Sequence, residues 1–401
     1  MRSKPDVTSL RAWTTLLLVS ALFFLVTATT FNALGPALHD MVGELHWSGG
    51  EAGLGFSLLG VFCGITATVP ALLIRRIGVR LTLALGGVVM AAAFACLATA
   101  HGLPLYFAGC SLAGLGFTLL ATVPGTYLLA RGFERPAFIF GLYFTLGQGG
   151  AVAGPLLYLW IAGMSGWRAV WIVSAVATLL TALLAAIAVD ARADVAAAAE
   201  QDPEITRESW PVAAALRTPQ FAVLAAAYSV FLFADITVNA FSIQHLMAHG
   251  VGETAAVSLL SLGALINAGG RLGGGLLSRV MDAKPLLVLA LLLLAGGLLA
   301  LCVGGGPLML LLYAGGIGIG SGLTFFASTI LLLDYFGRKP NLELFATVNL
   351  ISTVGSVGPA FAGLVFDHSG SFVPAFLILA TLVAVILVAA VRMKPPQAAP
   401  S

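Results

Sequence analysis

The chain has 401 residues, of which 59% are hydrophobic and only 9% are charged, and its formal net charge is +2. An ordinary soluble domain carries roughly 25% charged residues. The composition therefore excludes a soluble enzyme, a nucleic-acid-binding protein and a disordered regulator. Apolar stretches of about 18 residues or more, each long enough to cross a bilayer as a helix, recur along the chain. We therefore predict an all-α membrane protein.

Twelve transmembrane helices are predicted in chain order. They are expected at 13–38, 52–74, 81–100, 104–130, 137–163, 167–189, 219–247, 253–278, 285–303, 306–333, 342–366 and 372–391. Most exceed the roughly 20 residues that cross a bilayer, so tilted or kinked helices are expected. Among the prolines inside these spans are Pro70, Pro124, Pro155 and Pro359, and neighbouring helices can satisfy the carbonyls that they free.

The longest polar interval divides the spans six and six. It covers residues 190–218 and is predicted to be a linker. Residues 1–189 then form an N-terminal six-helix bundle, and residues 219–401 form a C-terminal six-helix bundle.

Basic residues indicate the orientation in the membrane. All of the 19 lysines and arginines except Arg168 and Arg271 fall on one side of the predicted spans, together with both termini and the linker. Because Lys and Arg are enriched in cytoplasmic loops, both termini are predicted to be cytoplasmic. The expected location is the cytoplasmic (inner) membrane of a bacterium, as a multi-pass protein.

The two halves repeat one another with a constant offset of 204 residues, so spans 2 to 6 align with spans 8 to 12 without a gap. Matching pairs include Arg75 with Arg279, Pro136 with Pro340, and Pro155 with Pro359. Six spans per half means that both repeats enter the membrane in the same direction. Such parallel repeats are a transporter design, with a substrate site near the midplane of the membrane.

The segment between spans 2 and 3 resembles the signature loop of the major facilitator superfamily. In residues 71–80 the chain keeps Arg76, Gly78 and Arg80, and it departs from the usual pattern at Ala71 and Arg75. The resemblance extends over nearly the whole chain. It implies the major facilitator fold, in which two parallel-repeat six-helix bundles work by alternating access.

Within this superfamily, three stretches resemble the monocarboxylate-transporter branch and its oxalate/formate antiporter relatives. They are residues 46–57, residues 267–271, and residues 335–370 with Gly358-Pro359 and Phe366-Asp367. The resemblance implies a small monocarboxylate such as lactate or pyruvate as substrate. The branch couples transport to protons through an acidic residue in span 8, but this chain has Asn267 at that position, so its residues do not support the usual coupling route.

Arg271 is the only basic residue deep within a predicted span. A guanidinium group in the membrane has to be paired or hydrogen-bonded, and its planar fork matches a carboxylate. Asn267 lies one turn earlier on the same helix face. We therefore predict that Arg271 and Asn267 bind a substrate carboxylate. The alternative is a structural pair between Arg271 and Asp235 that joins spans 7 and 8.

Asp235 is the only carboxylate near the middle of a predicted span. Its protonation depends on whether a substrate occupies the nearby arginine, so it is the predicted proton-coupling residue. Otherwise Asp235 is the counter-ion of Arg271 or caps a water-filled cavity.

Further polar or aromatic residues inside spans are predicted to line the substrate cavity. The alternative for the polar residues is an inter-helix hydrogen bond. Phe325 and Phe326 in span 10 are predicted to form an apolar wall or gate, with packing as the alternative. The predicted cavity-lining residues are Asn32, Tyr127, Tyr143, Gln148, Asn239 and Phe326.

We predict a secondary active transporter of a small organic anion, with H⁺ as the candidate coupling ion, that works as a monomer in the lipid bilayer. Glycines 316, 318 and 320 lie in an apolar span with no preceding strand, and no Walker motif is present. No enzymatic activity, cofactor, metal site or nucleic-acid partner is expected. Two alternatives stay open: a carrier of a larger solute such as a vitamin, an aromatic acid or a drug, and a non-transporting membrane sensor.

Overall fold

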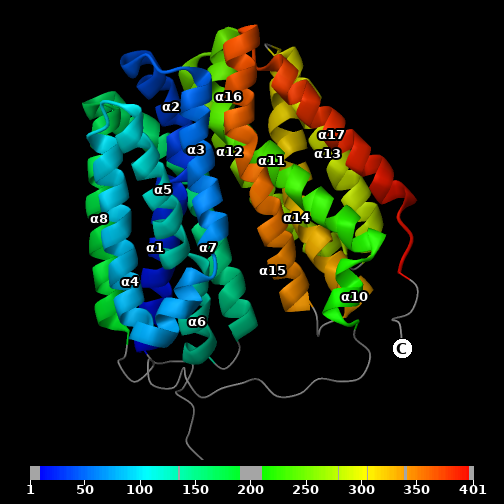
Figure 1. Ribbon diagram of the computed structural model, residues 1–401, viewed down its shortest axis with the longest axis horizontal. Coiled ribbons are helices and arrows are strands. Elements are labelled where there is room, and N and C mark those ends of the chain that lie inside the picture. The colour runs from blue at the N-terminus through cyan, green and yellow to red at the C-terminus, as the bar shows by residue number, and fades with distance from the viewer. Residues whose placement is uncertain are drawn as a thin grey trace, which may run out of the picture. The chain divides into compact units, whose positions relative to one another are not determined.

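The computed structural model describes residues 10–133, 136–189, 210–278, 280–304, 306–337 and 341–396. These residues are almost entirely helical, as Figure 1 shows, and the predicted all-α membrane fold is confirmed. Most of the predicted linker, residues 190–209, lies outside the described residues, as do Arg279, Arg338 and Lys339. The described end of the linker contains the short helix α10, Val212–Leu216.

The chain divides into two compact units, which are described here one at a time. Unit 1 contains residues 1–47 and 54–202, and unit 2 contains residues 48–53 and 203–401. The first turn of α3, Gly49–Ile65, thus groups with unit 2, whereas the rest of this helix belongs to unit 1.

Unit 1 is built on α1, which packs along α7 and α8, and on α4, which packs against α5 and α8. Gly78, with φ 83°, turns the chain inside α4, so this element contains the end of predicted span 2 and all of span 3. Besides α3 the helices of this unit are α1 Leu10–Thr29, α2 Phe31–Leu45, α4 Val69–Ala98, α5 Leu103–Leu120, α6 Thr122–Gly132, α7 Pro136–Ser165 and α8 Trp167–Ala188.

Unit 2 is built on α14, which packs against α12 and α13, and on α11, which contacts α14, α15, α16 and α17. Besides α10 its helices are α11 Pro219–Ala248, α12 Glu253–Leu277, α13 Ala283–Val303, α14 Pro307–Phe336, α15 Asn341–Ser352, α16 Gly358–Ser369 and α17 Val373–Arg392. A 3₁₀ turn, Thr353–Val357, joins α15 to α16.

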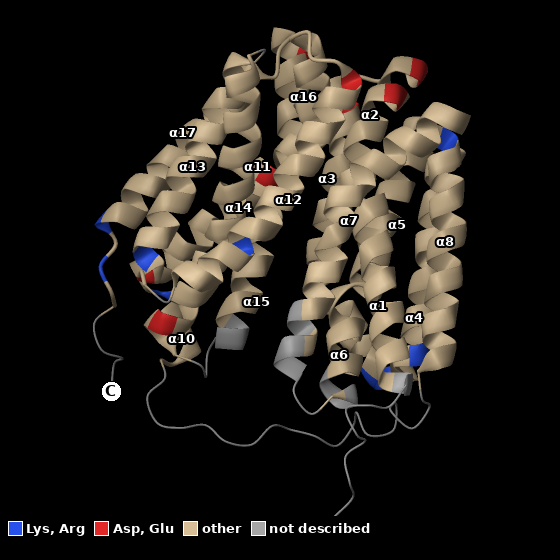
Figure 2. Cartoon of the chain, turned by 180° about the vertical axis from the view of Figure 1, so that it is seen from behind, with Lys and Arg blue, Asp and Glu red and all other residues tan. Residues whose placement is uncertain are grey.

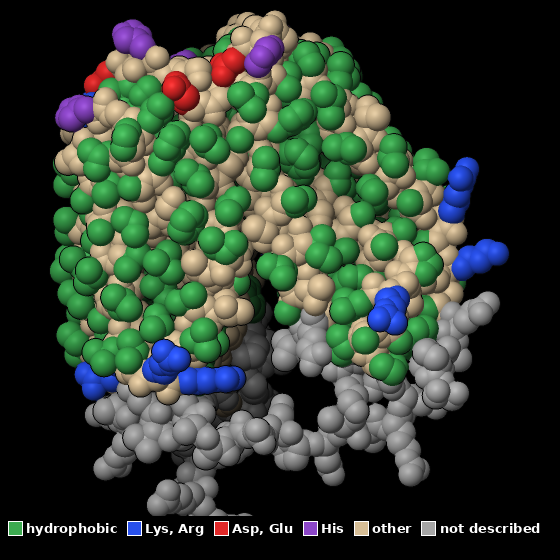
Figure 3. Space-filling model, viewed as in Figure 1, with side chains coloured by type: hydrophobic (Ala, Val, Ile, Leu, Met, Phe, Trp, Pro, Cys, Tyr) green, Lys and Arg blue, Asp and Glu red, His purple; other side chains and the backbone are tan. Residues whose placement is uncertain are grey.

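Ten helical segments among the described residues are long and apolar enough to cross a membrane. The two other predicted spans correspond to α3, with the start of α4, and to α7. Hydrophobic side chains cover the sides of the helices, whereas charged and His side chains gather at helix ends (Figure 3). In unit 1, basic residues lie where α4 and α8 meet, and acidic residues lie on α2 at the opposite helix ends (Figure 2).

Four of the predicted spans are broken rather than continuous. In the second span, residues 66–68 form a turn between α3 and α4. Thr30 separates α1 from α2 with φ −94° and ψ −101°, and Ala121 separates α5 from α6 with φ −85° and ψ −115°. In the eleventh span the 3₁₀ turn Thr353–Val357 precedes Pro359, which occupies the first turn of α16. Proline has no N–H to donate, so it fits the start of the new helix. Pro155, in contrast, lies inside the continuous helix α7.

Glycines set the separation of α13 and α14 in unit 2. A Cβ atom at Gly320 would lie 2.6 Å from the Leu294 nitrogen, and one at Gly297 would lie 2.5 Å from the Ile317 nitrogen. Small residues let helix backbones approach one another, and van der Waals packing drives helix association in lipid. The glycine-rich run in α14 is therefore a packing surface.

We expect Gly320→Ala to lower the free energy of unfolding by about 1–3 kcal/mol, because the new methyl group overpacks the contact with α13. Thermal unfolding of the purified protein in detergent measures this change. Gly315→Ala in the same helix is the matched control, since its Cβ would meet no atom within 4 Å. Equal melting temperatures for the two variants would contradict the assignment.

Candidate functional site

Arg271 lies on α12 in unit 2 and is half-buried. Its Nε donates a hydrogen bond of 3.1 Å to Oδ1 of Asn267, one turn earlier on the same helix. Its Cζ lies 4.3 Å from the centre of the Phe325 ring, in a cation–π contact. Asn267 and Phe325 therefore fix the plane of the guanidinium group.

The two Nη groups of Arg271 have no hydrogen-bond partner within the described part of the chain. Nε is used by Asn267 and one face is covered by Phe325, so the outer edge of the fork is the part that can receive a ligand. An arginine fork binds a carboxylate through two parallel N–H···O bonds. The arrangement thus leaves the outer edge of the guanidinium group without a protein partner among the described residues.

Asp235 lies on α11, close enough to Arg271 for the two charges to interact. Among the described side chains, however, these two do not come within the 4.0 Å of an ion pair. Asn239 follows Asp235 by one turn and donates from Nδ2 to the Asp235 backbone carbonyl at 2.8 Å. Asp235 is therefore an electrostatic neighbour of Arg271, and neither group is fully neutralised by the other.

Buried hydroxyl groups accompany Asp235. The Ser321 hydroxyl on α14 lies near the Asp235 carboxyl group, yet it completes no hydrogen bond. Ser242, two turns after Asp235 on α11, is also buried without a hydrogen-bond partner among the described residues. Buried polar groups are normally satisfied, so these hydroxyls mark a polar region at Asp235 that can take up water or a proton.

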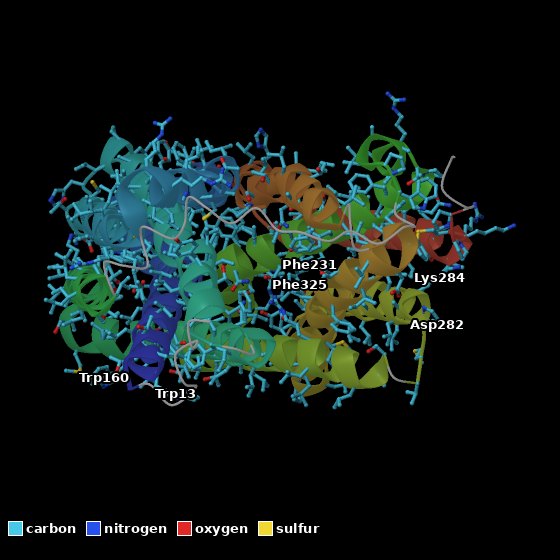
Figure 4. The ribbon with its side chains drawn as sticks, turned by 90° about the horizontal axis from the view of Figure 1, so that it is seen from below. Trp13, Trp160, Phe231, Asp282, Lys284 and Phe325 are labelled. Carbon is cyan, nitrogen blue, oxygen red and sulfur yellow. The ribbon has the colours of Figure 1, made fainter. Side chains whose placement is uncertain are left out.

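Aromatic rings surround the arginine. Tyr228 lies two turns before Asp235 on α11, and its ring centre is 5.9 Å from that of Phe325. It also contacts Phe231 at 5.4 Å and Phe345 at 6.0 Å. Figure 4 shows Phe231 and Phe325 among the helices of unit 2, whereas Asp282 and Lys284 lie at its edge. The ring that Arg271 contacts is therefore Phe325, with Tyr228 packed against it.

The sequence predicted an apolar wall or gate from Phe325 and Phe326, and the structure gives the two rings different neighbours. Phe325 contacts Arg271, while Phe326 fills the space against α12, where a Cβ at Gly274 would lie 2.7 Å from its Cδ1. Consecutive helical residues point about 100° apart, so only one of them can face the arginine. Composition alone could not decide whether Phe325 or Phe326 faces the arginine.

The four predicted cavity residues of unit 1 are placed as follows. Asn32 is buried, and its Nδ2 donates to the Thr27 carbonyl at 2.8 Å, beside the break between α1 and α2. Tyr143 is fully buried, and its hydroxyl donates to the Ala121 carbonyl at 2.8 Å, at the break between α5 and α6. Tyr127 and Gln148 are half-buried.

Asn32 and Tyr143 therefore satisfy carbonyl groups at the helix breaks in this conformation. In lipid no water is available for that purpose, so a side chain has to supply the hydrogen bond. The polar groups of Asn32 and Tyr143 are thus hydrogen-bonded within the protein. The outer edge of Arg271, in contrast, has no partner among the described residues.

Tyr228 is the neighbour of Arg271 and Phe325 that the sequence analysis did not name. A signal for Tyr228 was present, since it precedes Asp235 by seven residues and so shares its helix face. No comparable signal chose Phe325 over its neighbour.

Comparisons with known proteins bear on the whole chain. The family model described as Major Facilitator Superfamily matches residues 20–356. A protein of Bacillus subtilis (strain 168) described as "Uncharacterized transporter YycB" is 26% identical over 383 residues, which is 90% of this chain and 91% of that protein. The crystal structure of a mutant of the nucleoside transporter NupG covers 95% of this chain and 99% of its own, with a TM-score of 0.72 and 15% identity. That likeness shows the fold alone.

Replacing Tyr143 by Phe tests whether this hydroxyl serves the fold. We expect the free energy of unfolding to fall by about 1–3 kcal/mol, because the Ala121 carbonyl loses its buried donor. Thermal unfolding in detergent is the measurement. Unchanged stability, together with a weakened substrate affinity, would instead return Tyr143 to the substrate site.

Proposed function

The chain belongs to the Major Facilitator Superfamily and is a transporter, and from this premise we propose that its substrate is a small organic anion, a monocarboxylate such as lactate or pyruvate. The observation that supports this proposal is Arg271, whose guanidinium is oriented by Asn267 and Phe325 and keeps its outer edge without a protein partner in the described chain.

The physical argument concerns the cost of an unpaired charge. An arginine inside a membrane protein costs several kcal/mol unless it is paired. No described carboxylate forms an ion pair with Arg271. A substrate carboxylate would supply the missing partner, and two charge-assisted hydrogen bonds would fix its orientation.

Asp235 is proposed as the proton-coupling residue. A bound carboxylate would neutralise Arg271 and so remove the positive charge that favours ionised Asp235. Substrate binding and proton uptake at Asp235 would then support each other, which is the linkage that a symporter needs.

The aromatic wall favours a second candidate within the same class, a carboxylate with a planar ring. Phe325 offers apolar ring area beside the arginine and packs against the buried Tyr228, which in turn contacts Phe231, and such surfaces bind flat apolar groups. An uncharged solute such as a nucleoside would leave Arg271 unpaired, so nucleosides are the contrasting group in a substrate panel.

We further propose that the basic helix ends face the cytoplasm, that both termini are cytoplasmic, and that the protein functions as a monomer in a bacterial inner membrane. The distribution of Lys and Arg along the sequence supports this orientation.

The main experiment is uptake of labelled solutes into proteoliposomes across a panel of lactate, pyruvate, benzoate and uridine. We expect the carboxylates to be transported and uridine to be excluded. Arg271→Ala should lower carboxylate transport by about 100-fold, because two charge-assisted hydrogen bonds worth about 1.5–3 kcal/mol each are lost. Arg271→Lys keeps the charge but not the fork, so it should restore only part of the activity.

Arg168→Ala is the matched control, because Arg168 is engaged 2.6 Å from Glu44 in an exposed ion pair of unit 1. It should transport at the wild-type rate. Wild-type transport by Arg271→Ala, or uridine uptake that equals carboxylate uptake, would overturn the proposed substrate class.

Asp235→Asn tests the coupling. The amide cannot be protonated, so we expect loss of accumulation driven by a pH gradient while exchange of carboxylate across the membrane is retained. Asp282→Asn, which alters an exposed carboxylate of the same unit, should leave both activities unchanged. If Asp235→Asn still accumulates substrate in response to a pH gradient, another residue carries the proton.

A further inference from the structure

The start of α3 and the helix α16 touch backbone to backbone. A Cβ atom at Gly53 would overlap the Pro359 carbonyl, and one at Gly363 would overlap the Gly49 carbonyl. The contact therefore depends on glycines on both helices. Contacts this close hold only in one relative position of the two segments.

The N-terminus of α3 is only partly capped by its own residues. Ser48 and Glu51 form a reciprocal capping box, with Ser48 N donating to Glu51 Oε2 at 2.9 Å and Glu51 N donating to Ser48 Oγ at 3.1 Å. This arrangement leaves the N–H groups of Gly49 and Gly50, the first two residues of the helix, without a partner from their own segment.

Asp367, near the end of α16, completes the cap. Gly49 N donates to its Oδ1 at 2.8 Å, and Gly50 N donates to its Oδ2 at 2.7 Å. Both carboxylate oxygens are thus used by a helix 317 and 318 residues away in sequence. Its negative charge also lies at the positive end of the α3 dipole. The link is charge-assisted and specific in geometry.

The position of this link in the fold gives it a mechanical role. Residues 48–53 group with unit 2, and α3 continues from Leu54 into unit 1. Any motion that carries the body of α3 away from α16 has to pull the first turn of α3 off Asp367. The two hydrogen bonds then break together, since one carboxylate holds both.

The internal repeat contains no second copy of the link. The residues 204 positions from Gly49 and Asp367 are Glu253 and Gly163. Gly163 has no side chain to cap a helix, and a Cβ there would meet no atom within 4 Å. The carboxylate cap is therefore a feature of the α3–α16 pair and not a general requirement of the repeated fold.

We propose that Asp367 is a gating residue: its carboxylate latches the first turn of α3 to α16 in this conformation, and the conformational change of the transport cycle, which moves the body of α3 relative to α16, releases the latch. The proposal rests on transport by alternating access and does not depend on which solute is carried or whether Arg271 binds it.

Thiol labelling at the latch tests the proposal without any substrate. Ala360 lies in this contact, since its nitrogen is 3.1 Å from the position of a Cβ at Gly53, and it is only 8% exposed. Ala360→Cys is prepared in a background in which the four native cysteines are replaced by Ala, and the protein is placed in lipid nanodiscs, where a fluorescent maleimide reaches both faces. We expect slow labelling of this parent protein.

Asp367→Ala should raise the labelling rate by about tenfold or more, because two charge-assisted hydrogen bonds no longer hold the closed position. Asp367→Asn keeps the shape of the side chain but not its charge, so an intermediate rate is expected. Gly53→Ala should open the same contact from the α3 side, since its methyl group collides with the Pro359 carbonyl.

Two controls alter the same region or the same residue type without touching the latch. Glu44→Gln weakens an ion pair within unit 1, and Gly43→Ala adds a methyl group where no atom lies within 4 Å. Both should label at the parent rate. Thermal unfolding is measured for every variant, and Asp367→Asn carries the test if Asp367→Ala does not fold.

Parent-like labelling of a folded Asp367 variant would overturn the proposal, as would equal acceleration in the two controls. If Arg271→Ala changes carboxylate transport while the Asp367 variants still label faster, the latch proposal is unaffected. If the substrate panel behaves as expected but the Asp367 variants label at the parent rate, only the latch proposal is wrong. The two proposals therefore fail separately.

Discussion

The constraint on which this structure depends is that no backbone polar group can remain unpaired in the hydrocarbon of a membrane. It makes the described chain almost entirely helical, and it decides what happens wherever a helix is interrupted. At the breaks in the first and fourth spans, Asn32 and Tyr143 donate to carbonyls of Thr27 and Ala121. At the start of α3, Asp367 accepts from two free N–H groups. These polar side chains therefore pair with backbone groups that the helix breaks and helix ends leave free.

The charged side chains inside the helices are subject to the same constraint. Arg271 and Asp235 are embedded in helices of unit 2, yet their partners satisfy them only in part. Their counterparts in the repeat, 204 residues earlier, are Ala67 and Phe31, which carry no charge. The embedded charges therefore belong to one half of the repeat. A repeated scaffold with chemistry in one copy fits the general rule that function is carried by a site built onto a shared fold.

Much of the fold could be predicted, because its signals are local. Length of apolar runs, positions of basic residues and the constant repeat offset give the membrane class and the spans. For the site, Arg271, Asn267 and Asp235 stood out because charges and amides are rare within spans. Tyr228, the choice between Phe325 and Phe326, and the environment of Tyr143 did not, because aromatic residues are common in the spans and their role depends on which face meets which neighbour.

The sequence by itself determined that this chain crosses a membrane many times and that its scarce embedded charges lie on spans 7 and 8. Those facts follow from the cost of moving polar groups into lipid, which each segment bears separately. Only the tertiary structure decided that Phe325 and not Phe326 covers Arg271, that Tyr143 satisfies a helix break, and that Asp367 caps a helix more than 300 residues away. Such pairings depend on helix rotation and on the close approach of glycine-lined backbones, which no local pattern of residues encodes.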